Sequence, residues 1–179
     1  MHYYINYYIL INIKEKMNDF TNHGIETELF SLNGIKTYAR LVDVHDGDTG
    51  KVVFKLFDKY YKFIVRIDGI DTAELHSKNK LLKEKALEAR NRVIDFLSYG
   101  KIKVNNDSSS KDIQILLEKN ITIVYINCLE FDKYGRLLVD LQNINFKSVN
   151  SLLISENLAY KYEGDTKLSE EEQIKLFNY

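Results

Sequence analysis

Residues 36–67 read KTYARLVDVHDGDTGKVVFKLFDKYYKFIVRI, and apolar and polar side chains alternate along most of this stretch. A period of two is typical of β-strands that bury one face. Ala39 and Leu41 interrupt the first alternation. The buried faces are predicted to hold, strand by strand, Tyr38, Val42 and Val44, then Val52, Phe54 and Leu56, then Tyr61, Phe63, Val65 and Ile67. Turns at Asp46-Gly47 and Asp58-Lys59 complete a predicted three-stranded meander.

Beyond this meander the apolar spacing changes to three and four residues. Leu82, Ala86, Ala89, Val93 and Leu97 predict an amphipathic helix that ends near Gly100. Residues 121–131 are apolar on both faces and predict a buried strand, and Leu137, Val139 and Leu141 predict another. Two further helices are expected around 149–158 and 169–177, the second beginning with a capping box of Ser169 and Glu172.

The predicted order is β-β-β-α-β-β-α-α. It indicates an α+β, predominantly β fold: a five-stranded OB-type barrel with packed helices, an architecture suited to nucleic-acid ligands. Residues 105–119 begin with a polar loop and are interpreted as an insertion within residues 34–179, the predicted single domain.

The amino-acid composition argues against several classes of function. The chain has 179 residues, a net charge of −1 and a single cysteine, Cys128. One cysteine excludes an intramolecular disulfide and a thiolate cluster for zinc, and Cys128 is expected to be a buried small hydrophobe. The four histidines show no H-x-x-x-H spacing. Near-neutral charge argues against a purely electrostatic nucleic-acid binder.

Residues 1–33 differ from the rest and are predicted to be an N-terminal extension. The apolar run Tyr3–Ile13 is too short to span a bilayer, and no transmembrane span is expected. Three interpretations stay open: a degenerate signal or anchor, an ordered edge element, or a non-native extension with Met17 as the true start, which is favoured. A signal or anchor would imply secretion or membrane association, whereas a non-native extension would imply a cytoplasmic protein.

Three short segments combine acidic and basic side chains at turns and strand ends. They are Asp46-Gly47-Asp48-Thr49, residues 66–74 (RIDGIDTAE), and residues 132–136 (DKYGR). Each has an ordinary structural explanation. Asp-Gly marks a hairpin turn, residues 71–74 fit a helix N-cap, and residues 132–135 fit a type I turn.

Together the three segments predict metal-assisted phosphodiester hydrolysis. Asp48 and Asp71 lie at predicted strand ends, where a closed barrel would bring them together as oxygen ligands for Ca²⁺ or Mg²⁺. Glu74 could hold the attacking water without binding the metal. Arg66 and Arg136 could neutralise charge on the phosphoryl oxygens in the transition state.

At these motifs the chain resembles the staphylococcal nuclease (thermonuclease-like) family, over residues 36–177. The resemblance implies an OB-fold barrel and Ca²⁺-dependent, sequence-nonspecific cleavage of DNA and RNA that leaves 3′-phosphates. By position it implies metal ligands at Asp48, Asp71 and Thr72 and catalytic residues at Arg66, Glu74 and Arg136. It implies substrate contacts at Lys133, Tyr134, Tyr160 and Tyr162.

Three departures from the family pattern bear on activity, and one of them is the near-neutral charge, which would reduce affinity for long nucleic acid. Ala73 replaces the usual proline of the Asp-Thr-Pro-Glu signature, which would loosen the loop that positions Glu74, and the insertion at 105–119 would reshape substrate access. The alternatives are a non-catalytic nucleic-acid- or protein-binding module and a phosphodiesterase for small nucleotides. Nucleic-acid substrates are the expected partners of a monomer, and the sequence indicates no protein partner.

Overall fold

The computed structural model describes Met17, residues 20–164 and residues 166–178. The chain divides into two compact units, Met1–Phe30 and Ser31–Tyr179. In the first unit the described residues form turns closed by backbone hydrogen bonds, such as Phe20 N to Met17 O at 3.2 Å. The run Tyr3–Ile13 lies outside the described residues. In the part of the chain that is described, no helix has the length and apolar character needed to cross a membrane.

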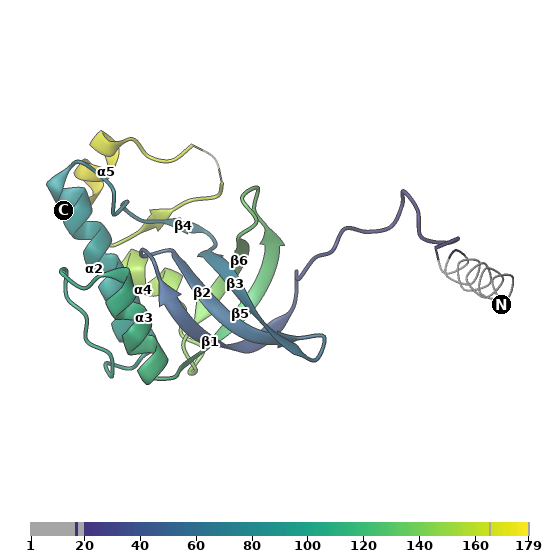
Figure 1. Cartoon of the computed structure of the whole chain (residues 1–179). Helices are drawn as coiled ribbons and strands as arrows, with labels where there is room; N and C mark the ends of the chain where they lie inside the picture. Colours follow the sequence, from purple (N-terminus) through teal and green to yellow (C-terminus); the bar gives the residue numbers. More distant parts are fainter. Residues whose placement is uncertain (1–16, 18–19, 165, 179) are drawn as a thin grey trace, which may run out of the picture. The chain divides into compact units, whose positions relative to one another are not determined.

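Five strands of the second unit form a closed barrel (Figure 1). Their order around the barrel is β1-β2-β3-β6-β5, and β5 pairs with β1 to close it. Neighbouring strands are antiparallel except for β3 and β6, which are parallel. The bounds are β1 Lys36–Val44, β2 Thr49–Leu56, β3 Lys59–Ile67, β5 Thr122–Phe131 and β6 Leu137–Gln142. The predicted α+β fold with a five-stranded OB-like barrel is confirmed.

The predicted buried faces hold for β2 and β6 but not for β1. Ala39 and Leu41 are buried, whereas Tyr38 is 55% exposed. The register between β1 and β2 shifts between Leu41 and Asp43, and a bulge of this kind reverses which side chains face the core. The sequence prediction for Tyr38 and Val42 was therefore wrong.

The turn between β2 and β3 lies one residue earlier than predicted. Leu56 pairs with Lys59, so Phe57 and Asp58 form a two-residue loop. Their φ angles of 47° and 64° are both positive, which is typical of the type I′ hairpin turn.

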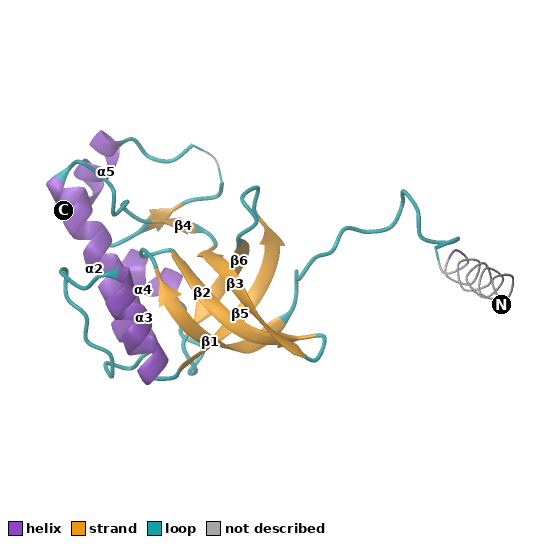
Figure 2. Cartoon of the chain, in the orientation of Figure 1, coloured by secondary structure: helices purple, strands orange, loops and turns teal. Residues whose placement is uncertain are grey.

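Four helices occur among the described residues (Figure 2). They are α2 Lys80–Leu97, α3 Ser110–Lys119, α4 Val149–Ser155 and α5 Glu170–Phe177. The capping box of Ser169 and Glu172 is confirmed at the start of α5. Within residues 105–119 the polar loop is followed by a ten-residue helix, α3.

A small two-stranded sheet links the barrel to the C-terminal segment. In it β4 (Ile70–Asp71) pairs with β7 (Tyr160–Lys161), and Asp71 lies opposite Tyr160. Beneath this sheet Tyr160 packs in a secondary apolar cluster with Ala73, Leu82, Ala86 and Phe177. The cluster fixes the chain around residues 71–74 against α2 and α5.

Candidate active site

Arg66 joins the two acidic motifs. Its guanidinium donates through NH1 to Asp48 Oδ2, and through NH2 to Asp71 Oδ1 at 2.7 Å and to the carbonyl of Ile70 at 3.2 Å. The exposed fractions of Arg66, Asp48 and Asp71 are only 7%, 3% and 1%. Arg66 is on the outer side of β3, as predicted, but it is buried rather than directed into solvent.

Local packing explains how Asp48 reaches Arg66. Thr49 is the cross-strand partner of Arg66, and the Ile67 amide donates to the Asp48 carbonyl at 2.7 Å. Gly47 has no room for a side chain, because a Cβ there would lie 2.7 Å from Ala89 Cβ and 2.8 Å from Thr72 Cγ2. The glycine of the Asp-Gly pair thus lets the β1–β2 loop pack directly on residues 71–74.

The electrostatics of the site favour a cation. Burial raises the pKa of the Asp48 carboxyl, and the neighbouring Asp46 adds to the rise while Arg66 opposes it. Burial also acts to raise the pKa of Asp71, but hydrogen bonds from Tyr160, Arg66 and Lys167 outweigh it and lower that pKa. Two buried carboxylates this close require compensating positive charge.

Glu74 reaches the same site through Lys167. The Lys167 ammonium lies 2.7 Å from Glu74 Oε1 and 3.0 Å from Asp71 Oδ1. Glu74 itself is exposed. One ammonium therefore holds the candidate base and a candidate metal ligand next to each other.

The N-cap interpretation of residues 71–74 was wrong. Helix α2 begins at Lys80, and its cap is Asn79, whose Oδ1 accepts from the amides of Leu81 and Leu82 at 2.9 and 3.3 Å. Asp71 lies in β4. The capping role is already filled by Asn79, so Asp71 and Glu74 need another explanation.

Arg136 is held by the turn that precedes it. Gly135 N donates to the Asp132 carbonyl at 2.9 Å, which confirms the predicted turn. Asp132 Oδ1 accepts from the amides of Tyr134 and Arg136, and Asp132 Oδ2 accepts from Arg136 Nε at 2.7 Å. The side chain of Asp132, which was predicted only to begin a turn, thus positions Arg136.

The two candidate catalytic arginines line one cleft. It has a volume of about 350 Å³, and its walls include Arg66, Arg136, Lys133, Tyr134 and Tyr162. The guanidinium of Arg66 lies 5.7 Å from the centre of the Tyr162 ring, and that of Arg136 lies 5.4 Å from the Tyr134 ring. The walls also include the acidic Asp68, Asp132 and Glu163, so the cleft combines basic, acidic and aromatic side chains. The basic and aromatic ones are of the kinds that bind nucleotides.

Tyr160 and Thr72 have supporting positions. Tyr160 is buried and donates from its hydroxyl to Asp71 Oδ2 at 2.5 Å, so it lies behind Asp71 and not in the cleft with Tyr162. Thr72 is buried and contributes its methyl group to the contact with Gly47. Of the residues that touch Asp71, sequence reasoning missed Lys167, which lies 93 residues beyond its partner Glu74 and belongs to no recognisable motif.

The residues present fit a hard cation by their chemistry. Asp48 and Asp71 are buried oxygen donors that both pair with the Arg66 guanidinium, and Ca²⁺ and Mg²⁺ prefer such donors. Lys167 adds a second positive charge at Asp71. Within the described residues, no group of three or more His, Cys, Asp or Glu side chains is arranged around a common metal position.

Neither the models of known protein families nor the curated proteins contain a match to this sequence.

Proposed function

We propose that this chain is a calcium-dependent, sequence-nonspecific nuclease that hydrolyses phosphodiester bonds of DNA and RNA and leaves 3′-phosphates. The resemblance to the staphylococcal nuclease-like family implies this activity. The observation that carries the proposal is the pair of contacts from Arg66 to Asp48 and Asp71, because it joins the two acidic motifs at one buried point. Arg66 also faces the cleft that contains Arg136.

Each side chain then has a defined task. Asp48, Asp71 and the carbonyl of Thr72 would hold Ca²⁺, which supplies positive charge to a bound phosphate. Glu74 is exposed next to Asp71 and accepts a proton from the attacking water. Arg66 and Arg136 balance the charge that develops on the phosphoryl oxygens.

The remaining cleft residues bind the substrate. Tyr134 and Tyr162 offer ring faces to the nucleotide, and Lys133 adds positive charge at the rim. Tyr160 orients Asp71 through its hydroxyl. Ala73, which stands where the family has proline, is 1% exposed and packs in the secondary apolar cluster. This packing supports an ordered loop before Glu74.

A non-catalytic nucleic-acid-binding module is the second candidate. The observation in its favour is that Arg66 and Lys167 already satisfy the carboxylates that a metal would need. A module of this kind would bind nucleic acid in the cleft without calcium and would not cleave it.

The deciding experiment is incubation with plasmid DNA and with single-stranded RNA, in calcium or in chelator, at neutral and alkaline pH. We expect both substrates to be degraded only with calcium. Binding without cleavage would instead favour the module.

The variants Asp48→Asn and Asp71→Asn test the metal ligands. Either substitution removes a charge that balances Arg66, and removing one partner of a buried ion pair costs about 3–5 kcal/mol. Asparagine is preferred to alanine because it keeps the side-chain shape and an oxygen that accepts from the guanidinium. Both asparagine variants should lose calcium binding in calorimetry and most cleavage. Asp107→Asn, in the exposed loop before α3, is the control and should retain both.

A further inference from the structure

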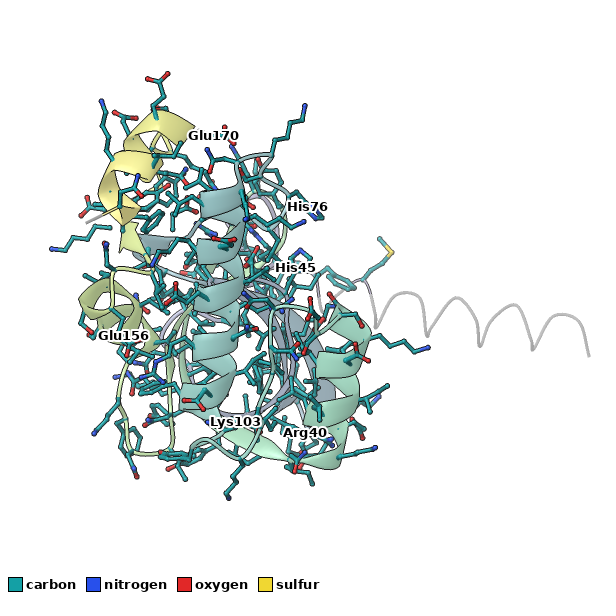
Figure 3. All side chains as sticks on the ribbon, turned by 90° about the vertical axis from the view of Figure 1, so that its left-hand side faces the viewer. Arg40, His45, His76, Lys103, Glu156 and Glu170 are labelled. Carbon is teal, nitrogen blue, oxygen red and sulfur yellow. The ribbon has the colours of Figure 1, made fainter. Side chains whose placement is uncertain are left out.

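A second pocket lies away from the candidate active site, between α3 and the outer face of β1, β2 and β3. Its volume is about 590 Å³, within the usual range for ligand sites. Figure 3 shows Arg40 beside one end of α3. The charged side chains that line the pocket are the basic Arg40, Lys51, Lys62 and Lys111 and the acidic Asp43 and Glu118.

The insertion builds one wall of this pocket. Helix α3 is attached to β1 by an ion pair between Arg40 and Glu118 at 2.9 Å and by a hydrogen bond from Gln114 Nε2 to Asp43 Oδ2 at 3.1 Å. Lys51 also pairs with Asp43, at 2.8 Å. The two acidic side chains of the pocket, Asp43 and Glu118, are therefore already paired, and both hold α3 against β1.

Two lysines keep their positive charge available. Among the residues that the structure describes, no carboxylate lies within ion-pair distance of Lys62 or Lys111. Both side chains line the pocket, one from β3 and one from α3. The chain as a whole carries a net charge of −1, so this is a local excess of positive charge on a nearly neutral protein.

The strand register connects this pocket with the active site. Alternate residues of β3 share a face, which places Arg66, Ile64, Lys62 and Tyr60 in one row. At about 3.3 Å per residue, Lys62 lies about 13 Å and Tyr60 about 20 Å from Arg66 along the strand. Ile64 is 50% exposed and Tyr60 is 75% exposed, so the row continues as accessible apolar and aromatic surface.

We infer that this row and the α3 pocket form an extended subsite for single-stranded nucleic acid, which holds the strand that flanks the phosphate at Arg66. The inference rests on the proposed function, which places the scissile phosphate at that residue. Lys62 and Lys111 contact flanking phosphates, and Tyr60 provides a stacking surface for a base. The length of the row suits OB folds, whose sites cover about 4–16 nucleotides.

The test measures binding of a fluorescein-labelled single-stranded 12-nucleotide DNA by fluorescence anisotropy, in chelator so that no cleavage occurs. The variant is the full chain with Lys62→Ala and Lys111→Ala together. Each lost phosphate contact to a single strand should reduce the slope of log K against log salt by about 0.7. For the variant that lacks both lysines we therefore expect this slope to be smaller by about 1.4 than in the wild type. Its affinity at low salt should be at least tenfold weaker. Tyr60→Ala should weaken binding without changing the slope.

The control is Lys83→Ala with Lys147→Ala, which removes the same charge from exposed positions that line neither pocket. Three results would each overturn the inference. The control could lower the slope as much as the pocket variant does, the pocket variant could leave the slope unchanged, or the wild type could fail to bind the 12-mer.

Hydrolysis of bis(p-nitrophenyl) phosphate with calcium separates this inference from the proposed function. The diester is too short to reach the α3 pocket, so the Lys62→Ala, Lys111→Ala variant should hydrolyse it at the wild-type rate. If the wild type cleaves neither nucleic acid nor this diester with calcium but the slope difference persists, the nuclease proposal fails and the subsite remains. A variant that loses hydrolysis of this short diester would overturn the subsite.

Discussion

The Lys167 ammonium lies 2.7 Å from the Glu74 carboxylate and bridges it to Asp71, 3.0 Å away. Lys167 belongs to the segment before α5, whereas Glu74 follows β4, so the C-terminal part of the chain closes over the candidate site. A metal ion that binds Asp71 would compete with this ammonium for the same carboxylate oxygen.

Removing the charge of Lys167 should therefore ease calcium binding. Lys167→Met keeps much of the side-chain length and removes the competing cation. Because partly exposed ion pairs are worth about 0.2–1 kcal/mol, the calcium concentration for half-maximal cleavage should fall by at most about fivefold. A calcium titration of cleavage rates measures this, with Lys161→Met, an exposed lysine in β7, as control. A higher calcium requirement would show that Lys167 positions Glu74 instead.

Asp132 should act on catalysis through Arg136. Asp132→Asn keeps an acceptor for the turn amides but removes the ion pair with Arg136 Nε. We expect a lower turnover number, a smaller loss than Arg136→Ala causes, and little change in calcium affinity. Steady-state kinetics beside calcium calorimetry distinguish these effects, and a loss of calcium affinity would contradict the assignment.

The same variant should show a defined pH dependence of stability. Burial acts to raise the pKa of Asp132, but the hydrogen bonds from Arg136 and Tyr134 outweigh it and lower the pKa below its ordinary value. The folded state therefore binds fewer protons than the unfolded state, in which the pKa is about 3.9. The stabilisation by Asp132 is present above that pH and is lost as the pH falls through the folded-state pKa. The difference in melting temperature from Asp132→Asn should be full at neutral pH and disappear in acid.

The barrel was predictable because its strands are locally amphipathic. Val52 and Phe54, and likewise Leu137 and Val139, are buried as the alternation requires. The face of β1 was not predictable, since the bulge after Leu41 depends on pairing with β2. Alternation reports which residues share a face, but it does not report where a strand bends.

The motifs of the candidate site were recognisable in the sequence, but the contacts between them and the position of Lys167 were not. The motifs around Asp48, Arg66 and Asp71 carry recognisable internal spacings. The burial of Arg66 results from β4 and Tyr162, and the role of Tyr160 from the pairing of β7 with β4. The contacts made by Tyr160 and Tyr162 join segments about ninety residues apart, and no local pattern encodes them.

The N-terminal residues provide a prediction about stability. A chain that begins at Met17 should melt at the wild-type temperature and cleave normally. A chain that begins at Gly34 loses Leu32, which is 1% exposed in the main core. Loss of a buried leucine side chain costs about 2–5 kcal/mol, so this shorter chain should melt clearly lower. Thermal denaturation compares the three proteins. A large drop for the chain that begins at Met17 would show that residues 1–16 contribute to the fold.

Glu74→Gln gives the sharpest separation between an enzyme and a binding module. Glutamine keeps the size and hydrogen-bonding capacity of the side chain but cannot accept a proton from water. General-base assistance is worth about 10²–10⁴-fold, so single-turnover cleavage should slow by that factor while nucleic-acid affinity changes little. Glu74 is exposed and does not cap α2, and its ion pair with Lys167 is worth only about 0.2–1 kcal/mol, so the melting temperature should fall only slightly.

Asn79→Ala is the matched control for Glu74→Gln. Asn79 supplies the cap of α2, and loss of such a cap costs about 1 kcal/mol. This variant should lower the melting temperature and leave the cleavage rate intact at temperatures where it remains folded. Glu74→Gln should thus mainly change the cleavage rate, whereas Asn79→Ala should mainly change the stability. Full cleavage by Glu74→Gln would remove Glu74 from the catalytic mechanism, even if calcium dependence were observed.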